Sequence, residues 1–215
     1  MISALTTNVS QFFREAQHFD MLCDALLPTF RERIRTGQRI RIWSAGCSNG
    51  QEPYSVAMHL LSLEPSLADA DFRILATDID PNVIAFAQQG KYAPAQLKGV
   101  PKSHLHGFTM AHPDDGGDRV MSERLKTVVS FRELNLFDDW PMQFPFDAIF
   151  CRNVVIYFDQ PTQERLWPRF STRIRPGGLL FLGHSERIAE PGAHGFRSCG
   201  PTAYTKTAPS HFNSR

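Results

Sequence analysis

Residues 39–55 read RIRIWSAGCSNGQEPYS, and this stretch decides the fold class. Basic and β-favouring residues alternate at its start, which is typical of a strand. Gly46 and Gly50 then interrupt the pattern, and Pro53 stands near the start of a segment of helical character. Because proline in the first turn of a helix loses no hydrogen bond, Pro53 indicates a helix start rather than a break. A strand, a glycine turn and a helix in this order are the first unit of a nucleotide-type α/β fold.

The turn itself, residues 46–50, fits two kinds of site. Its letters GCSNG match G-x-S-x-G, the nucleophile elbow of hydrolases, with Ser48 as the nucleophile. It also resembles the degenerate glycine loop of S-adenosylmethionine (SAM) methyltransferases, in which the backbone approaches the amino-acid end of the cofactor. The turn by itself leaves both interpretations open.

The next strand, residues 72–76, is followed by Thr77 and Asp78. A carboxylate just past the second strand of such a fold can accept hydrogen bonds from both hydroxyls of a ribose. The other interpretation is that Asp78 only caps the helix that begins at Pro81. From these residues alone, cofactor binding and a structural role are both open.

Length and composition are those of an ordinary globular domain. The chain has 215 residues, of which 42% are hydrophobic and 21% charged, so it is most simply one domain with a full-sized core. The net charge of +1 argues against a broad electrostatic surface for nucleic acid. No apolar run approaches membrane-spanning length, and the N-terminus lacks a signal-peptide core. We therefore expect a cytoplasmic monomer that is not inserted in a membrane.

The four cysteines lie far apart and form no C-x-x-C pair. That spacing predicts free thiols in a reducing compartment rather than a disulfide frame or a zinc site, and we expect no metal centre. The thiols are Cys23, Cys47, Cys151 and Cys199.

Residues 1–38 are expected to form helices that pack on the core. Cap-type residues precede a short helical segment that carries Phe12 and Phe13, and we expect these rings to face the core and Arg14 to face solvent. A longer amphipathic helix follows, and Gly37 ends it.

Residues 108–134 break the alternation of strands and helices, after a connector over residues 91–107. Two short extended runs flank the turn-rich residues 112–117, which predicts a β-hairpin, and residues 127–131 supply a third extended run. We therefore expect a small antiparallel insert. It is either a lid or elaboration, or an exposed edge to which a partner's extended peptide can add as a strand.

The alternation resumes after residue 134. The apolar run 146–151 predicts a buried strand. Arg152 and Asn153 stand where the chain leaves that strand, which is where open α/β sheets hold their ligands. A helix, another strand and a closing hairpin complete the pattern. The fold class is therefore α/β, with a sheet of about seven strands that is mostly parallel and has an antiparallel end.

Five motifs in a fixed order make a family resemblance specific. They are TNxSxFFRE at residues 7–15, WSAGCSNGQEPYS at 43–55, ATDID at 76–80, FDAIFCRNVVIYF at 146–158 and GHSE at 183–186. Together they resemble the catalytic domain of the bacterial chemoreceptor glutamate methyltransferases, the CheR family. The resemblance extends over about residues 6–206.

This resemblance implies a Rossmann-like, SAM-dependent O-methyltransferase that esterifies glutamate side chains on the cytoplasmic helices of chemotaxis receptors. Residues 39–107 and 135–207 would form the SAM-binding domain, residues 108–134 a β-subdomain, and residues 208–215 a tail. Some members of the family bind a C-terminal peptide of the receptor at the β-subdomain by strand addition.

The resemblance also implies the residues of the site. Asp78 would bind the ribose hydroxyls and Glu52 the ammonium end of the cofactor. Arg14 would hold the incoming carboxylate, and Tyr157 would line the slot where the substrate enters. Because a glutamate carboxylate is already ionised at neutral pH, this reaction needs no general base. The residues implied to hold the cofactor are Asn8, Ser10, Arg14, Glu52, Asp78, Asn135, Leu136, Arg152 and Asn153, with Asn135 and Leu136 framing the adenine.

Two other functions remain open. A serine hydrolase would use Ser48 as nucleophile and His184 as base, with Asp147 or Asp159 as the acid. Against it, the carboxylate of Glu52 close to the nucleophile would disfavour a developing oxyanion. A non-catalytic SAM-sensing module that binds receptors would take up the cofactor without transferring its methyl group.

Overall fold

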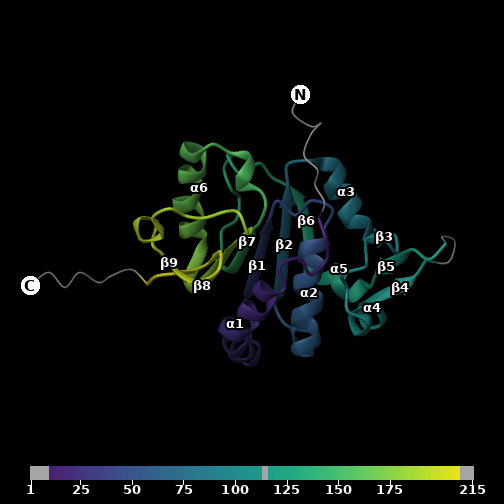
Figure 1. Ribbon diagram of the computed structural model, residues 1–215. Coiled ribbons are helices and arrows are strands. Elements are labelled where there is room, and N and C mark those ends of the chain that lie inside the picture. Colours follow the sequence, from purple (N-terminus) through teal and green to yellow (C-terminus); the bar gives the residue numbers. More distant parts are fainter. Residues whose placement is uncertain (1–9, 113–115, 209–215) are drawn as a thin grey trace, which may run out of the picture.

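The computed structural model describes residues 10–112 and 116–208. Its centre is a seven-stranded sheet in the order β6-β2-β1-β7-β8-β10-β9, drawn in Figure 1. The strands from β6 to β8 run parallel, and β10 runs antiparallel to both of its neighbours. The predicted sheet with its antiparallel end is therefore confirmed. The strands are β1 (Ile40–Ala45), β2 (Phe72–Asp78), β6 (Val129–Glu133), β7 (Phe146–Cys151), β8 (Ile174–Leu182), β9 (Phe196–Gly200) and β10 (Ala203–Lys206).

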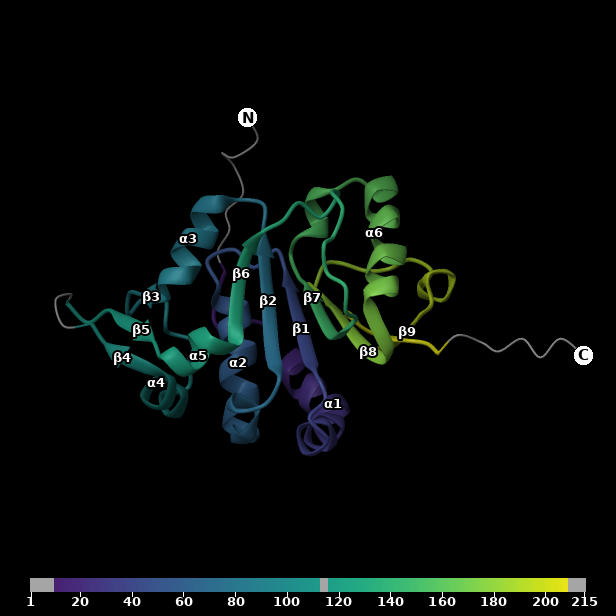
Figure 2. The same cartoon turned by 180° about the vertical axis from the view of Figure 1, so that it is seen from behind.

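Helices cover both faces of this sheet, as the two opposite views in Figures 1 and 2 show. Successive side chains of β1 point to opposite faces, so Ile42 belongs to one buried cluster and Trp43 to the other. The helices that pack on the first cluster include α1 (Gln17–Arg35), α2 (Gln51–Leu63), α3 (Pro81–Gln89) and α5 (Glu123–Val128), and α6 (Gln160–Arg173) packs on the second. Short 3₁₀ turns complete the elements: η1 (Pro65–Ala68), η2 (Val155–Tyr157) and η3 (Pro191–His194).

Local hydrogen bonds fix the connection from β2 to α3. The carboxylate of Asp80 accepts a hydrogen bond from the backbone N–H of Asn82 at 2.8 Å, so Asp80 caps the helix. Gly90 ends the helix in the left-handed conformation, with a φ of 64°. Asp78 is therefore not the cap of this helix, and the capping interpretation of Asp78 is wrong.

The N-terminal segment does not form the short helix that its cap-type residues predicted. Phe13 and Glu15 have positive φ angles of 55° and 56°, and left-handed residues cannot continue a right-handed helix. Phe12 is buried and Phe13 packs against the core, so the prediction for these two rings is confirmed. The first helix of the described chain is α1, which begins at Gln17.

The long amphipathic helix predicted next is α1. Its buried side chains recur at helical spacing and pack into the first cluster, among them Leu22, Leu26 and Phe30. Gly37 follows the helix with a φ of 66°, the left-handed conformation common after helix ends. No helix of the described residues is long and apolar enough to cross a membrane.

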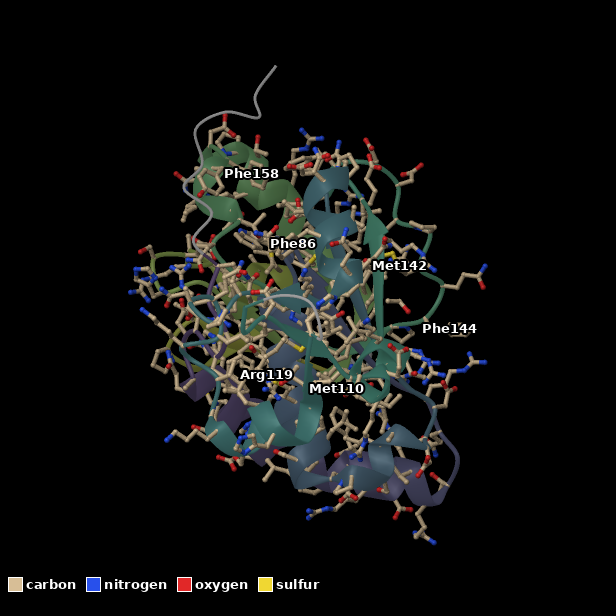
Figure 3. All side chains as sticks on the ribbon, turned by 90° about the vertical axis from the view of Figure 1, so that its right-hand side faces the viewer. Phe86, Met110, Arg119, Met142, Phe144 and Phe158 are labelled. Atoms are coloured by element: carbon tan, nitrogen blue, oxygen red, sulfur yellow. The ribbon has the colours of Figure 1, made fainter. Side chains whose placement is uncertain are left out.

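A second, three-stranded antiparallel sheet lies beside the main one, in the order β3-β5-β4. Figure 3 faces this side of the molecule, with Met110 of β4 and Arg119 of β5 labelled. Its elements are β3 (Lys91–Tyr92), α4 (Lys102–Phe108), β4 (Thr109–Ala111) and β5 (Arg119–Met121). The predicted small antiparallel insert is therefore present.

One prediction for this insert is wrong. Residues 127–131 do not form its third strand, because α5 extends to Val128 and β6 then joins the main sheet parallel to β2. The reason is burial: Val129 and Phe131 pack into the main core. The third strand of the insert is β3 instead, from the stretch that the sequence indicated to be a connector.

Candidate active site

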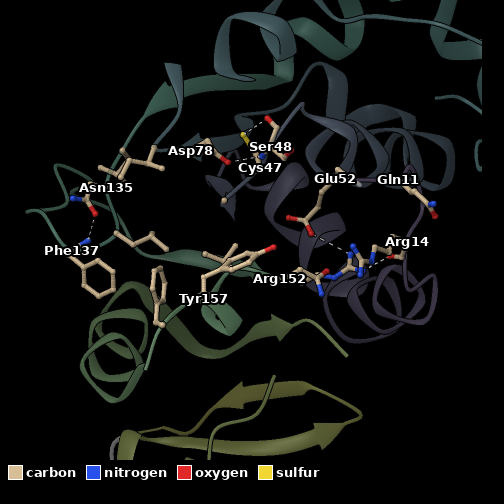
Figure 4. Close-up of a pocket in the computed structure, with 18 of the residues that line it drawn as sticks. Gln11, Arg14, Cys47, Ser48, Glu52, Asp78, Asn135, Phe137, Arg152 and Tyr157 are labelled. Atoms are coloured by element: carbon tan, nitrogen blue, oxygen red, sulfur yellow. Dashed lines mark hydrogen bonds and ion pairs between the residues drawn. The ribbon is translucent and has the colours of Figure 1, made fainter. Parts of the chain in front are cut away.

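A cavity of about 360 Å³ opens at the carboxyl ends of β1, β2 and β7. This is the edge at which open α/β sheets hold ligands, and the volume suits a small molecule. Figure 4 shows most of the residues that line it. The structure brings together there the predicted residues Ser10, Arg14, Glu52, Asp78, Asn135, Leu136, Arg152, Asn153 and Tyr157. The last predicted residue, Asn8, lies outside the described residues.

The glycine turn shapes one wall of the cavity. The N–H groups of Gly46 and Cys47 both donate to the carbonyl oxygen of Thr77 at 2.8 Å, which ties the turn to the end of β2. Gly46 has a φ of 87°, and a Cβ at this position would collide with the side chain of Val154. Glycine is therefore required here both by backbone conformation and by close packing.

Asp78 is held rigidly at the end of β2. One carboxylate oxygen accepts a hydrogen bond from the N–H of Ser48 at 2.8 Å, and the other accepts from the N–H of Asp80 at 3.1 Å. Since a carboxylate has about four acceptor positions, two remain for a ligand. The fixed side chain lines the cavity and can bind a pair of hydroxyl groups.

Glu52 lies in the first turn of α2 with only 15% of its side chain exposed. Its carboxylate accepts a hydrogen bond from the hydroxyl of Ser44 at 2.7 Å and lies 3.3 Å from a guanidinium nitrogen of Arg152. Burial raises the pKa of Glu52, and the charge of Arg152 partly opposes that shift. A cationic group in the cavity would favour the ionised form, so Glu52 can hold an ammonium.

Arg152 leaves the end of β7 and is almost completely buried, with 3% of its side chain exposed. Its guanidinium lies 3.3 Å from the carboxylates of both Glu15 and Glu52, and it also donates to the backbone carbonyl of Arg14. The Nε atom is buried and has no hydrogen-bond partner within the described part of the chain. Arg152 therefore joins the N-terminal segment to the cavity and offers a further donor.

The exit from β7 is fixed by a residue that sequence reasoning did not assign to the site. Glu186 accepts hydrogen bonds from the N–H groups of Gly183, Asn153 and Ile156 at 2.6, 2.9 and 3.1 Å. These bonds hold Asn153 in the left-handed conformation, with a φ of 59°. Glu186 belongs to the GHSE motif. Its carboxylate fixes the backbone at Asn153, directly after Arg152, at the exit from β7.

The other end of the cavity is apolar. Leu136 is buried, and the amide oxygen of Asn135 accepts a hydrogen bond from the N–H of Phe137 at 3.0 Å. The rings of Phe137 and Phe158 meet edge to face at 4.9 Å. Sequence reasoning missed several of the lining residues, although most adjoin a predicted motif: Gln11, Phe19, Ile79, Leu134, Phe137, Val154 and Phe158.

Comparison with known proteins shows the family of this chain. Residues 8–204 match the family described as "CheR methyltransferase, SAM binding domain". The chain belongs to the CheR family. It is similar to a "Probable chemotaxis protein methyltransferase" of Rhizobium etli, with 47% identity over 96% of this chain and 78% of that protein. It is also similar to "Chemotaxis protein methyltransferase 2" of Pseudomonas aeruginosa, with 42% identity over 95% of this chain and 71% of that protein.

These findings confirm the resemblance that the five motifs carry. The CheR-family chain is a SAM-dependent methyltransferase, and its cofactor is SAM. The chemistry of the cavity fits this group: its apolar end could receive an adenine, and its two carboxylates could accept hydrogen bonds from hydroxyl groups and pair with an ammonium. The buried Nε of Arg152 and the buried hydroxyl of Ser48, which have no partner in the described structure, are further polar atoms available to it.

The hydrolase alternative is not favoured. No hydrogen bond joins Ser48 to His184 among the described residues, and the carboxylate that contacts the His184 ring is Glu15. Asp147 lies at the opposite end of β7, where it pairs with Arg33 and Arg175. The other offered acid, Asp159, caps α6 instead. Although the φ of 49° at Ser48 gives a strained turn of the kind found at nucleophile elbows, the other members of a triad are not assembled around it.

Proposed function

We propose that this CheR-family chain transfers the methyl group of SAM to glutamate side chains of chemotaxis receptors and forms glutamyl methyl esters. The observation that carries the proposal is the single cavity that joins Glu52 and Asp78 to a rim formed by Arg14 and Tyr157. The names of the relatives, chemotaxis protein methyltransferases, support this class of substrate.

The rim residues have the exposure that an incoming protein side chain requires. Arg14 has 37% of its side chain exposed, and Tyr157 is 52% exposed. When bound, SAM supplies an activated methyl group on a sulfonium. Arg14 would grip the glutamate carboxylate with its planar guanidinium and align one oxygen, while Tyr157 would close the slot and exclude water. The nucleophile is already ionised, so no residue of the chain has to remove a proton.

Each part of the cofactor is assigned to a different group of lining residues. We propose that Asp78 binds the ribose hydroxyls, Glu52 the ammonium, and Asn135 with Leu136 the adenine. The remaining contacts would come from Asn8, Ser10, Arg14, Arg152 and Asn153. The fixed carboxylate of Asp78 and the buried carboxylate of Glu52 support these roles.

The small sheet is proposed as a second contact with the receptor. β4 lies at an edge of that sheet, and Met110 on it is 55% exposed. An extended receptor peptide could add to such an edge as a further strand. If it does, a C-terminal receptor peptide should bind with the same affinity in the presence and absence of SAM, and the absence of binding in calorimetry would remove this contact. We further propose that the protein acts as a monomer in the cytoplasm.

Calorimetry with S-adenosylhomocysteine tests the cofactor site through Asp78. The Asp78→Ala variant should bind at least about tenfold more weakly, because charge-assisted hydrogen bonds are lost. Asp80→Ala is the matched control, since it removes a nearby carboxylate that does not line the cavity. Equal affinities of the wild type and Asp78→Ala would contradict the assignment.

Methyl transfer to vesicles that contain a chemotaxis receptor tests the reaction. Arg14→Ala should lower the rate about 100-fold, far more than it weakens the binding of S-adenosylhomocysteine, because the substrate carboxylate loses its alignment and the cofactor loses one of several contacts. A SAM-sensing module would bind cofactor and transfer nothing even as wild type. Labelling of Ser48 by a fluorophosphonate probe would instead support a hydrolase and overturn the proposal.

A further inference from the structure

The N-terminal turn, residues 12–16, has an unusual backbone beside the cavity. Phe13 and Glu15 both adopt left-handed φ angles, 55° and 56°, on either side of Arg14. Residues with a Cβ rarely adopt this conformation, and it persists only where the surrounding structure holds it. The contacts that hold the turn are therefore informative about its function.

Two contacts pin the backbone of the N-terminal turn. The N–H of Phe13 donates to the hydroxyl of Ser55 in α2 at 3.0 Å, and Arg152 donates to the carbonyl of Arg14. These contacts come from separate parts of the fold that both line or support the cavity. The position of Arg14 at the rim thus depends on Arg152.

The carboxylate of Glu15 is the centre of a charged cluster. Only 11% of its side chain is exposed, and it lies 3.3 Å from Arg152, 3.4 Å from the ring of His18 and 3.6 Å from the ring of His184. It also lies 3.9 Å from the side chain of Arg14 and accepts a hydrogen bond from the N–H of His184. Glu15 does not line the cavity, so its effects must pass through these neighbours.

One guanidinium is thereby shared between two carboxylates. Glu15 and Glu52 each lie 3.3 Å from Arg152, on different nitrogen atoms. Figure 4 shows Arg152 with dashed contacts toward Glu52 and toward Arg14. Without the charge of Glu15, Glu52 would be the one carboxylate left within 4 Å of the Arg152 guanidinium among the described residues.

We propose that Glu15 is a positioning residue for cofactor binding: by sharing the charge of Arg152, it leaves the carboxylate of Glu52 available to the ammonium of SAM, and it holds Arg14 at the rim. This inference rests on the proposed role of Glu52. It assigns to the last residue of the TNxSxFFRE motif a function that acts through Arg152 rather than by contact with the ligand.

The charges around Glu52 give this role a second readout, the pKa of Glu52. Burial raises the pKa of Glu52, Arg152 lowers it, and the charges of Glu15 and Glu186 raise it further. The other titratable groups that face Glu52 are the thiols of Cys47 and Cys151, whose pKa values burial raises well above the usual value, so they stay neutral. Burial and Arg152 lower the pKa of His18 beside Glu15, which keeps this ring neutral near pH 7. Removing the charge of Glu15 should therefore lower the pKa of Glu52.

Two ligands separate a positioning role from a general structural one. S-adenosylhomocysteine carries the ammonium, whereas 5′-methylthioadenosine has the same nucleoside and sulfur without the amino-acid end. Glu15→Gln should bind S-adenosylhomocysteine about tenfold more weakly at pH 7.5 and 5′-methylthioadenosine unchanged. The acid limb of the S-adenosylhomocysteine affinity profile should move to lower pH. Glu190→Gln, which removes an exposed carboxylate outside the cluster, should change neither.

Glu15→Asp covers the case in which Glu15→Gln does not fold. Aspartate keeps the charge, but its shorter side chain holds the carboxylate farther from Arg152. We therefore expect the same pattern, with a loss of about threefold in affinity for S-adenosylhomocysteine. Wild-type affinity in the folded Glu15→Gln variant, or in Glu15→Asp if only that one folds, would overturn the proposal. So would an equal loss for both ligands, or a loss without a change in the pH profile. If Glu52→Gln itself left the affinity unchanged, the role of Glu52 would be the part that fails.

Discussion

At Glu52, burial and ligand binding place opposite demands on one carboxyl group. Burial raises the pKa of Glu52 because the charged form loses its hydration, and Arg152 compensates only in part. A bound ammonium needs the charged form. Burial therefore shifts the protonation equilibrium of Glu52 toward the neutral form, and a bound ammonium would shift it back toward the charged form.

This conflict predicts a pH dependence of cofactor affinity. As pH falls through the raised pKa of Glu52, the carboxyl becomes protonated and the affinity for S-adenosylhomocysteine should decrease. Calorimetry across pH 5 to 8 measures the effect. Glu52→Gln should bind weakly at every pH and lose this limb of the profile. An acid limb that survives in Glu52→Gln would assign it to another group.

The turn between β1 and α2 shows how one element fixes the cavity. Gly46 has a left-handed φ, and the side chain of Val154 leaves no room for a Cβ at this position. Gly37, after α1, has a similar φ of 66° but nothing within 4 Å of an added Cβ. A side chain at Gly37 would therefore cause backbone strain alone, whereas a side chain at Gly46 would cause both strain and a steric collision.

Substitution by alanine should reveal that difference. Gly37→Ala should lower the free energy of unfolding by about 1 kcal/mol, from backbone strain alone. Gly46→Ala should lower it by about 2–4 kcal/mol, because collision with Val154 adds to the strain. Urea unfolding measures both. In the Val154→Ala background, the loss in free energy of unfolding from Gly46→Ala should fall toward that from Gly37→Ala. Equal losses for the two substitutions in the wild-type background would contradict a contribution from the collision.

At the scale of the whole fold, three histidines among the described residues are less basic than usual. Burial lowers the pKa values of His18, His59 and His104. His18 is the most enclosed: its ring is fully buried and contacts the carbonyl of Pro201 at 3.2 Å and the hydroxyl of Thr202 at 3.1 Å. These contacts join α1 to the turn before β10, at the far end of the sheet order from β6.

Stability should therefore decrease in mild acid. In the unfolded chain the histidines have a pKa of about 6.5 and bind protons below that pH, whereas in the folded chain their pKa values are lower and they stay neutral. The free energy of unfolding therefore falls as pH falls toward the lowered pKa values of the folded state. For His18 the slope is at most about 1.4 kcal/mol per pH unit. Glu52 acts in the opposite direction, because its raised pKa means that its contribution to stability is lost as pH rises through that value.

Comparing variants isolates the histidine contribution. Urea midpoints at pH 7.5 and 5.5 should differ less in His18→Gln than in the wild type, since glutamine keeps hydrogen-bonding capacity and does not titrate. His106→Gln, at an exposed position of α4, is the control and should behave as the wild type. An unchanged difference in His18→Gln would contradict this account.

The sequence alone was sufficient for the first βα unit, the family and most of the cavity. Gly46, Pro53 and Asp78 carry local information, because backbone conformation, helix starts and strand ends depend on neighbouring residues. Parallel strands also align their carboxyl ends at one edge, so residues that follow β1, β2 and β7 were expected to meet, and the structure brings them together.

Tertiary structure decided what local patterns could not. Residues 127–131 have the composition of a hairpin strand, yet burial of Val129 and Phe131 places β6 in the main sheet. The sharing of Arg152 between Glu15 and Glu52 joins groups from the N-terminal segment, from α2 and from the end of β7. Their charges interact through distance and burial, and neither quantity is encoded in the spacing of residues along the sequence.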